Sequence, residues 1–557
     1  MQVQQTCSFE CDKIMEMLKN ANEKIYSILH DLALELGVNE VNFLIETPKE
    51  KSHGDLASNI SLVLAKDLKK PPMEIANNLL ESLEKLSDLK KDFAKIEVVE
   101  PGFINFYFSK SYLASKLNEI IALGSDFGLL DLGKGKKVSV EFVSANPTGP
   151  LHIGNARGGP LGDTIANVFT KAGYEVTRDY LHNNVGGQVD KLGEAIYFKI
   201  HPDQIKEGYE IQYQGEYVAE LSEMVKEQMD KHDDLSQEEF IQKAGEIAVE
   251  IMLLEILKDC KDMGISFDKI RKESDLRKEV ESILPKITNS LKENEGALWF
   301  APNDEFLKDR ETVVRKSNGE FTYFASDIVY HNEKMSANDL VIDVLGANHS
   351  GHVPRLLAIV KAFGFDPQNL KVVLYQWIRL KRGEEVIKMS KRAGTFVTAR
   401  EVLDEVGKDA FRFFLLMPRS QTHMDFDLEL AKKKAADNPV FYIQYAYSRI
   451  CSVFKKSEES VENPDLSLLT QKEEMDLIRT LIALPNLVEK VSNTLEVNSF
   501  CTYALEIANL FHKFYEAQRV LSKDIEITKA RLALLRATQI TLKNTLGILG
   551  VNAPESM

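Results

Sequence analysis

Residues 138–158 read VSVEFVSANPTGPLHIGNARG, from Val138 to Gly158. The first six residues are rich in β-branched valine, which is typical of a buried strand, and a helical pattern follows at residues 156–172. A second strand pattern covers residues 175–179. This strand, loop, helix and strand succession predicts a parallel sheet with right-handed crossovers.

The loop between the first strand and its helix is a candidate phosphate site. Ligands bind at this place in open α/β sheets, because free backbone N–H groups and the helix dipole favour anions. Gly149 and Gly154 would let a ligand approach the backbone, and His152 can donate a hydrogen bond to a triphosphate. The alternative is a loop of glycine and proline with a chance histidine.

A second loop, at residues 383–395, carries Lys388, Lys391 and Arg392 beside Gly394. Such a loop can fold over a nucleotide and neutralise a leaving pyrophosphate as charge builds on it. Taken alone, a lysine-rich loop is more often a solvated surface. Because it lies beyond the last strand pattern, at residues 371–374, we expect the two loops to face one nucleotide from two sheet halves.

The whole chain predicts a multidomain α/β protein, since 557 residues are too many for one hydrophobic core. We expect an α+β N-terminal domain at 1–110 and a Rossmann-type parallel-sheet domain at 111–400, with a helical insertion at about 200–295. A linker at 401–437 would lead to an all-α bundle at 438–557, where the pattern is almost wholly helical.

Composition limits the class of protein. A net charge of −16 argues against a general nucleic-acid binder, so any RNA contact must be local. Five scattered cysteines include no CxxC pair, which argues against structural zinc and against a disulfide framework. No apolar run reaches the roughly 18 residues of a membrane span and no secretion signal begins the chain, so we expect a cytoplasmic protein.

The two loops together resemble the HIGH and KMSKS signatures of class I aminoacyl-tRNA synthetases, and the first is similar to the arginyl branch. The resemblance implies ATP with Mg²⁺ as cofactor and His152, Asn155, Lys388 and Lys391 as catalytic residues. Asn155 stands where the family usually has histidine, but its amide can still donate a hydrogen bond. The HIGH region comprises Ala145, Asn146, Pro147, Thr148, Gly149, Pro150, Leu151, His152, Ile153, Gly154 and Asn155, and the ATP contacts implied are Pro150, His152, Gly154, Asn155, Lys388, Met389, Ser390 and Lys391.

A pocket for arginine must offer carboxylates to a planar guanidinium and polar groups to the α-amino group. Tyr323 and Asp327 are four residues apart, on one face of a helical turn, and Glu273 is a possible second carboxylate. Any one acidic residue among 85 is most simply a surface charge, so only joint placement would support a site. The resemblance implies Glu141, Asn146, Tyr323 and Asp327 as arginine contacts, and the full set that we expect also includes Ser144, Glu273 and His349.

Two further stretches lie near this expected pocket. The spacing of His349 and His352 suggests metal ligands, but no other His/Cys pair completes a zinc set, so we interpret their loop as a polar wall. Residues 180–188 resemble a family stretch near the active site, although His182 departs from its usual pattern.

The helical C-terminal part is a candidate tRNA-binding region. Tyr442, Gln444, Tyr445 and Arg449 combine rings for stacking with hydrogen-bond donors suited to unstacked bases, although aromatic side chains on a helix can equally pack inward. The region resembles the DALR anticodon-binding domain. Residues 53–59 and 101–105 resemble the extra N-terminal domain of arginyl enzymes, which contacts the tRNA elbow; only residues 1–14 fall outside the resemblance.

The resemblance therefore implies a monomeric ligase that uses ATP to activate L-arginine, only when tRNA is bound, and transfers it to the 3′ end of tRNA(Arg). A cysteinyl or glutamyl enzyme is the nearest alternative; the missing zinc ligands and the acidic pocket argue against these two. A catalytically silent RNA-binding relative is the other alternative, and Asn155 is its best support.

Overall fold

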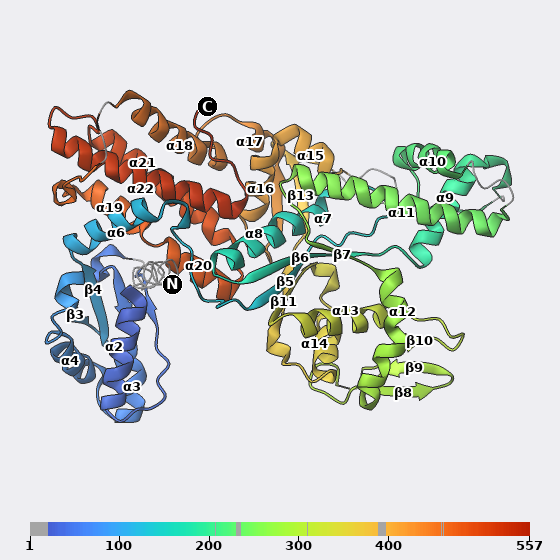
Figure 1. Ribbon diagram of the computed structural model, residues 1–557, viewed down its shortest axis with the longest axis horizontal. Coiled ribbons are helices and arrows are strands. Elements are labelled where there is room, and N and C mark those ends of the chain that lie inside the picture. The colour runs from blue at the N-terminus through green and yellow to red at the C-terminus, as the bar shows by residue number, and fades with distance from the viewer. Residues whose placement is uncertain are drawn as a thin grey trace, which may run out of the picture.

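The computed structural model describes residues 21–48, 50–205, 208–229, 235–308, 310–387, 397–457, 459 and 462–557. Within these ranges the chain forms a central parallel sheet flanked by helices, an α+β unit at the N-terminal side and a C-terminal helix bundle (Figure 1). The predicted fold class is confirmed. No helix in the described ranges combines the length and the apolar character needed to cross a membrane.

The N-terminal unit is an antiparallel sheet of order β1-β2-β4-β3 covered by helices with their own apolar core. Its elements are α2 (Ala21–Glu35), β1 (Ile45–Glu46), β2 (Leu56–Ser58), α3 (Ile60–Leu68), α4 (Pro72–Leu83), α5 (Leu89–Asp92), β3 (Phe93–Val99) and β4 (Phe103–Phe108). The Ser109 side chain then caps α6 (Lys110–Leu123), which leads to the central sheet.

The central sheet has the order β12-β11-β5-β6-β7, and all its strands are parallel. These strands are β5 (Lys137–Glu141), β6 (Glu175–His182), β7 (Lys269–Lys272), β11 (Leu340–Gly346) and β12 (Leu370–Tyr375). The helices around them are α7 (Ile153–Ala156), α8 (Gly158–Lys171), α12 (Glu273–Ile283), α13 (Tyr323–Ala337) and α14 (Val353–Ala362). Helix α9 (Gly187–Ile200) lies apart from these and packs against residues 237–262. Successive strands are added on one side of β5 up to β7 and on its other side from β11, so the topological switch point, where such sheets bind ligands, lies between β5 and β11.

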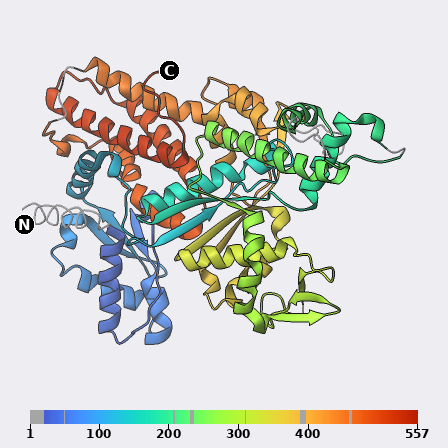
Figure 2. The ribbon, with the colours of Figure 1, turned by 45° about the vertical axis from the view of Figure 1, so that its right-hand side comes forward.

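The insertion consists of α10 (Glu216–Met229) and α11 (Gln237–Asp262), which reach away from the sheet in both views (Figures 1 and 2). The segment expected as helical insertion, at about 200–295, also contains β7, which pairs with β6 and completes the sheet. The sequence Lys-Ile-Arg-Lys does not predict a strand, because it is short and mostly charged and forms the edge of the sheet. A small antiparallel sheet follows, formed by β8 (Leu291–Asn294), β9 (Ala297–Phe300) and β10 (Thr312–Arg315).

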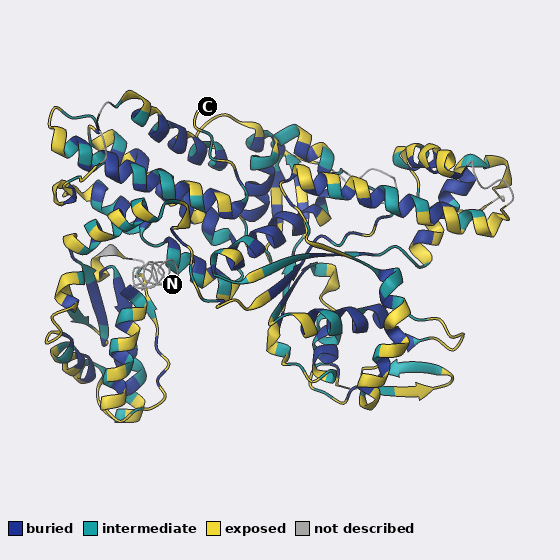
Figure 3. Ribbon diagram, viewed as in Figure 1, coloured by how far each residue is buried: buried dark blue, intermediate teal, exposed yellow. Residues whose placement is uncertain are grey.

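Beyond the central sheet, a connecting region leads into the bundle. It contains β13 (Ile378–Arg382), β14 (Glu385–Val386), α15 (Ala399–Val406), α16 (Lys408–Leu416), β15 (Met424–Asp427) and α17 (Leu428–Lys432). The bundle comprises α18 (Pro439–Lys456), α19 (Lys472–Leu481), α20 (Leu484–Thr494), α21 (Asn498–Ala517) and α22 (Ile525–Leu549). One apolar cluster runs from the sheet into the bundle without a break, so buried residues continue across this junction (Figure 3).

A buried arginine also crosses the junction. Arg412 of α16 is fully buried and donates to the carboxylate of Asp163 on α8 at 2.6 Å, to the Leu549 carbonyl at the end of α22 at 2.8 Å, and to the Met263 carbonyl at 3.1 Å. One guanidinium therefore joins the helix after the first loop, the end of the insertion and the end of the bundle.

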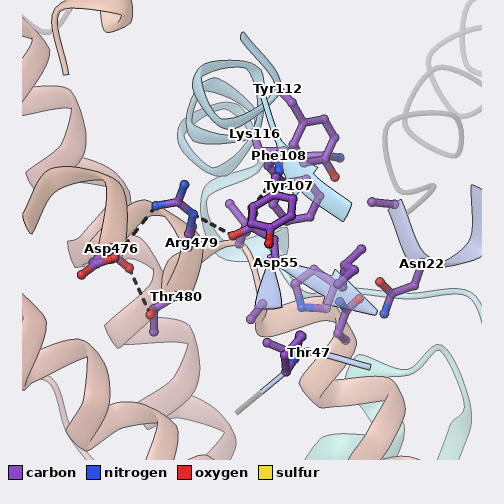
Figure 4. A pocket seen from close by; sticks show the side chains of 18 of the residues that line it. Asn22, Thr47, Asp55, Tyr107, Phe108, Tyr112, Lys116, Asp476, Arg479 and Thr480 are labelled. Atoms are coloured by element: carbon purple, nitrogen blue, oxygen red, sulfur yellow. Dashed lines mark hydrogen bonds and ion pairs between the residues drawn. The ribbon is translucent and has the colours of Figure 1, made fainter. Parts of the chain in front are cut away.

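The N-terminal unit meets the bundle at a cavity of about 390 Å³ (Figure 4). Arg479 of α19 donates to one oxygen of Asp55 at 2.7 Å, while the other oxygen of Asp55 accepts the backbone N–H of Phe108 at 2.7 Å. Asp55 therefore fixes β4 and the bundle at the same time.

Candidate active site

The candidate active site begins at the end of β5, where the backbone takes an unusual turn. Val143 and Ser144 have φ values of 67° and 36°, in the left-handed region that β-branched residues rarely occupy. The turn brings the Ser144 hydroxyl back to Oε1 of Glu141 at 2.9 Å, and the same hydroxyl accepts the Leu181 N–H from β6 at 3.1 Å. Strain of this kind is concentrated at functional sites.

A cavity of about 400 Å³ opens at the carboxyl ends of β5, β6 and β11. The structure brings all seven predicted arginine contacts together in its wall: Glu141, Ser144, Asn146, Glu273, Tyr323, Asp327 and His349. Residues from four separate stretches of the chain therefore meet at the switch point. Asn146 is held by Asn183, whose Nδ2 donates to its Oδ1 at 2.8 Å.

Beneath this cavity lies a buried charge network. The Lys334 ammonium donates to Oε2 of Glu141 at 2.7 Å and to Oδ1 of Asp343 at 2.6 Å. His331 contacts the Asp327 carbonyl through Nδ1 and Oδ2 of Asp343 through Nε2, both at 2.9 Å. Both ring nitrogens therefore lie within hydrogen-bond distance of an acceptor oxygen.

Both carboxylates of this network, Glu141 and Asp343, have hydrogen-bond partners within it. Burial by itself would raise the pKa of Asp343, but the charge of Lys334 and the hydrogen bond from His331 outweigh it and leave that pKa below its usual range. The pKa of Lys334 is raised, because Asp343 and Glu141 outweigh the effect of burial. Glu141 and Asp343 thus share the Lys334 ammonium as a partner, and Asp343 also contacts His331.

Asp327 and Glu273 are in a different state. Burial raises the pKa of Asp327 to about 6, and no hydrogen bond or ion pair to its carboxylate is present among the described residues. Glu273 is 1% exposed, and burial raises its pKa, while the nearby Arg277 counteracts part of that effect. Its Oε2 is buried without a hydrogen-bond partner in the described part of the chain. The cavity therefore presents carboxylate oxygens that suit a cation with several donors.

The first loop sits beside this cavity at the start of α7. Nδ1 of His152 accepts the Gly154 N–H at 2.9 Å, so the neutral ring carries its proton on Nε2, which is then a donor. Asn155 is exposed, and its amide makes no hydrogen bond to any described residue, whereas its carbonyl accepts from the Tyr375 hydroxyl at 3.3 Å. Pro150 and Gly154 are partly exposed on the same loop.

The second predicted loop lies largely outside the described residues, and this includes Lys388, Met389, Ser390 and Lys391. Its downstream end is nevertheless tied to the first loop. The Ala399 N–H donates to the Leu151 carbonyl at 2.7 Å, and the Ile153 N–H donates to the Val397 carbonyl at 3.2 Å. These bonds support the expectation that both loops serve one site.

Arg157 is a positioning residue that the sequence did not single out. It is 1% exposed, and its guanidinium donates to the carbonyls of Gln376, Thr422 and Arg419 at 2.9 to 3.0 Å. Among the described residues it has no acidic partner, and burial lowers its pKa to about 10. Arg157 therefore holds the start of α8 against the chain on both sides of the second loop, at Gln376 before it and at Arg419 and Thr422 after it.

The sequence also missed Lys334, His331 and Asp343. The structure brings these residues together, because Asp343 lies directly opposite Glu141 in the pairing of β11 with β5, and His331 and Lys334 follow Asp327 at helical spacing. The paired HxxH residues have ring centroids 5.7 Å apart and both line the cavity. Within the described ranges, no three His, Cys, Asp or Glu side chains are placed to hold a metal ion.

The predicted tRNA contacts lie on α18 in two environments. Tyr445 is 43% exposed, and Arg449 lies between the rings of Tyr445 and Tyr515, 5.8 and 4.2 Å from their centroids. Tyr442 packs against His512 at 4.8 Å. Gln444 is buried, because its amide donates to Asp409 at 2.8 Å and to the Asn552 carbonyl at 2.9 Å. The structure therefore leaves Tyr445 on the surface and turns Gln444 towards the protein.

Comparison with known proteins agrees with this geometry along the chain. Three family models match: "Arginyl tRNA synthetase N terminal domain" at residues 12–108, "tRNA synthetases class I (R), catalytic domain" at 117–425 and "DALR anticodon binding domain" at 443–557. The arginine–tRNA ligase of Carboxydothermus hydrogenoformans is 40% identical over 97% of this chain and 100% of its own length, and that of Dehalococcoides mccartyi is 40% identical over 98% of each. The solved arginyl-tRNA synthetase of Thermus thermophilus superposes with a TM-score of 0.79 over 96% of this chain and all of its own, at 22% identity, which supports the fold.

Proposed function

The chain belongs to the arginyl-tRNA synthetase family and is an arginine–tRNA ligase, and we propose that the cavity at the switch point is where it binds and activates L-arginine. The observation that carries this assignment is the set of unpaired carboxylate oxygens in the cavity. Glu141 and Asp343 have partners in Lys334 and His331, whereas among the described residues the Asp327 carboxylate has no partner and Glu273 keeps one oxygen unpaired. A guanidinium supplies the missing charge and several donors in one plane.

We propose the following roles for the rest of the pocket. Tyr323 borders the guanidinium beside Asp327, and Asn146, Ser144 and Glu141 face the α-amino end at the strand terminus. His349 closes the side towards the nucleotide, and burial lowers its pKa, which favours the neutral ring. This arrangement would place the arginine carboxylate towards the loop that carries His152.

Activation requires in-line attack of an arginine carboxylate oxygen on the α-phosphorus of ATP. The bond from that phosphorus to the bridging oxygen breaks, and pyrophosphate leaves. ATP enters with Mg²⁺ as its counter-ion. Nε2 of His152 and the Asn155 amide donate to the phosphates, and Pro150 and Gly154 allow close approach. Lys388 and Lys391 would neutralise the leaving group, with Met389 and Ser390 in the same loop. A ribose hydroxyl at the 3′ end of tRNA then attacks the arginyl carbonyl, and AMP leaves.

We propose that tRNA(Arg) contacts both ends of the molecule. Tyr442, Tyr445 and Arg449 form the bundle surface for unstacked bases, and Gln444 supports that helix from within. The N-terminal domain contacts the tRNA elbow. We propose that the domains span residues 1–110, 111–400, 401–437 and 438–557, and that the protein is a cytoplasmic monomer.

The decisive experiment is aminoacylation of total tRNA with arginine, with each of the other amino acids as a control. We expect charging with arginine alone. Charging with a different amino acid would overturn the specificity. Pyrophosphate exchange into ATP should require tRNA together with arginine, and equal exchange with arginine alone would contradict the expected tRNA dependence.

A further inference from the structure

Arg277 lies one helical turn after Glu273 on α12 and binds one oxygen of its carboxylate. Its Nε and Nη2 donate to Oε1 of Glu273 at 3.1 and 2.9 Å. The Ser326 hydroxyl contacts the same oxygen at 3.3 Å. The two residues differ in environment, because the Glu273 side chain is 1% exposed and that of Arg277 is 28% exposed.

Arg277 also fixes the aromatic wall of the pocket. Its guanidinium carbon lies 5.3 Å from the ring centroid of Tyr323, within the range of a cation–π interaction. Gly186 covers both groups: a Cβ added there would lie 2.4 Å from the Tyr323 hydroxyl and 3.2 Å from Nη2 of Arg277. Arg277, Tyr323 and Glu273 are therefore packed as one unit beneath the backbone of the loop before α9.

The consequence concerns the second oxygen of Glu273. Because Arg277 and Ser326 occupy Oε1, Oε2 is left buried and without a partner among the described residues, in a side chain that lines the same cavity as Asp327. Arg277 itself does not line that cavity. The guanidinium of Arg277 thus orients the carboxylate of Glu273 so that its other oxygen can accept from the guanidinium of an arginine substrate.

We propose that Arg277 is a positioning residue for arginine recognition: by anchoring Oε1 of Glu273 and the ring of Tyr323, it presents Oε2 to the substrate guanidinium without touching the substrate. The inference rests on the proposed arginine pocket, since it assigns a role within that site.

The surrounding charges give this role a signature in pH. Glu273 faces Arg277 on its own helix and Ser326, Tyr323 and Asp327 on α13. Arg277 also interacts electrostatically with Asp190 of α9 and with Glu320. Burial raises the pKa of Glu273, and Arg277 opposes that rise. Without Arg277, Glu273 takes up a proton at higher pH than in the wild type, and a neutral acid attracts the substrate cation less.

The test is aminoacylation kinetics of Arg277→Met, which keeps the bulk beside Tyr323 but cannot donate to Glu273. We expect KM for arginine to rise about 10- to 100-fold, with KM for ATP unchanged and with the increase larger at low pH. Arg277→Lys keeps the charge and should recover the wild-type pH profile more fully than KM. Lys278→Met, on the same helix with a 75% exposed side chain, should leave every constant unchanged.

A double-mutant cycle separates positioning from general damage to the fold. In a Glu273→Gln background, Arg277→Met should change KM for arginine by less than about twofold, because the carboxylate through which it acts is gone. The proposal is overturned by an unchanged or lower KM in Arg277→Met, by equal rises in the KM values for arginine and ATP, or by an undiminished effect in the Glu273→Gln background. Failure of the wild-type protein to charge tRNA with arginine would instead refute the proposed function.

Discussion

Nζ of Lys334 lies 2.7 Å from Oε2 of Glu141, and this contact joins α13 to the first strand of the central sheet. Both side chains are buried, at 1% and 7% exposure, and the same ammonium reaches Asp343 on β11. One side of the proposed arginine cavity is therefore formed by buried charged groups whose stability depends on each partner being present.

Replacement of Lys334 by methionine should be strongly destabilising, because it removes the cation shared by two buried carboxylates and leaves Asp343 with His331 alone. Breaking such a pair from one side costs roughly 3 to 5 kcal/mol. We expect a clear fall in the thermal midpoint and a higher KM for arginine, measured by calorimetry and aminoacylation. Lys316→Met, which removes an exposed pair with Glu320, should cost about 0 to 1 kcal/mol. Similar losses in both variants would contradict the account.

The affinity for arginine should depend on the protonation of Asp327. Burial raises the pKa of this acid to about 6, so its carboxylate form is lost as the pH falls through that value. KM for arginine should therefore rise as the pH is lowered from about 7.5 to about 5.5. Asp327→Asn should raise KM by about 100-fold and flatten this pH dependence. A wild-type KM that stays constant over the same range would refute the role of Asp327.

Asn155 should contribute to the phosphate chemistry despite replacing histidine. Its amide is exposed, and in the proposed mechanism it donates to the charge that develops on the phosphates. Loss of one such donor typically lowers kcat by roughly 100- to 1000-fold. We expect Asn155→Ala to lower kcat in pyrophosphate exchange, measured with tRNA present, and Asn155→His to remain active. An alanine variant with wild-type kcat would remove Asn155 from the catalytic set.

Tyr445 should act in tRNA binding alone. Stacking of a base on an aromatic ring contributes about 1 to 3 kcal/mol, so Tyr445→Ala should raise KM for tRNA by about 5- to 100-fold. Tyr445→Phe keeps the ring and serves as the control. KM for arginine and ATP should not change in either variant, and an equal effect of the two substitutions would point away from stacking.

The pair of Arg479 and Asp55 should affect how the N-terminal domain is held. Arg479→Ala removes the contact to the bundle but leaves Asp55 bound to the Phe108 N–H. Because the pair is partly exposed, we expect only about a threefold rise in KM for tRNA. Faster proteolysis where the N-terminal domain ends, near residue 110, should accompany the higher KM, and Arg479→Lys should show a smaller change. Unaltered proteolysis in the alanine variant would argue against the tether.

The seven predicted arginine contacts were proposed largely from the family resemblance of the stretches that contain them. Glu141, Asn146 and Asp327 each lie in such a stretch, and the structure gathers them in one cavity. Lys334 and Asp343 gave no such signal. Their importance comes from pairing across elements, and a lysine within a helix is indistinguishable in sequence from a solvated one.

The same limit explains β7 and Gln444. The charged strand β7 is defined by its pairing with β6, which no local pattern reveals. Gln444 stood among aromatic residues and was expected to face RNA, yet its partners Asp409 and Asn552 are far away in the chain. Whether a polar side chain faces solvent or another element is decided by packing between domains.

The guanidinium of Arg412 has a consequence for protein engineering. It contacts Asp163 of α8 and the last carbonyl of α22, and Gly550 must follow without a side chain, since a Cβ there would stand 2.3 Å from the guanidinium carbon. A chimera that exchanges only the C-terminal bundle between relatives would therefore combine the end of α22 from one parent with Arg412 and Asp163 from the other. Helices α8, α16 and α22 should be exchanged together, and recombination libraries should take all three from one parent.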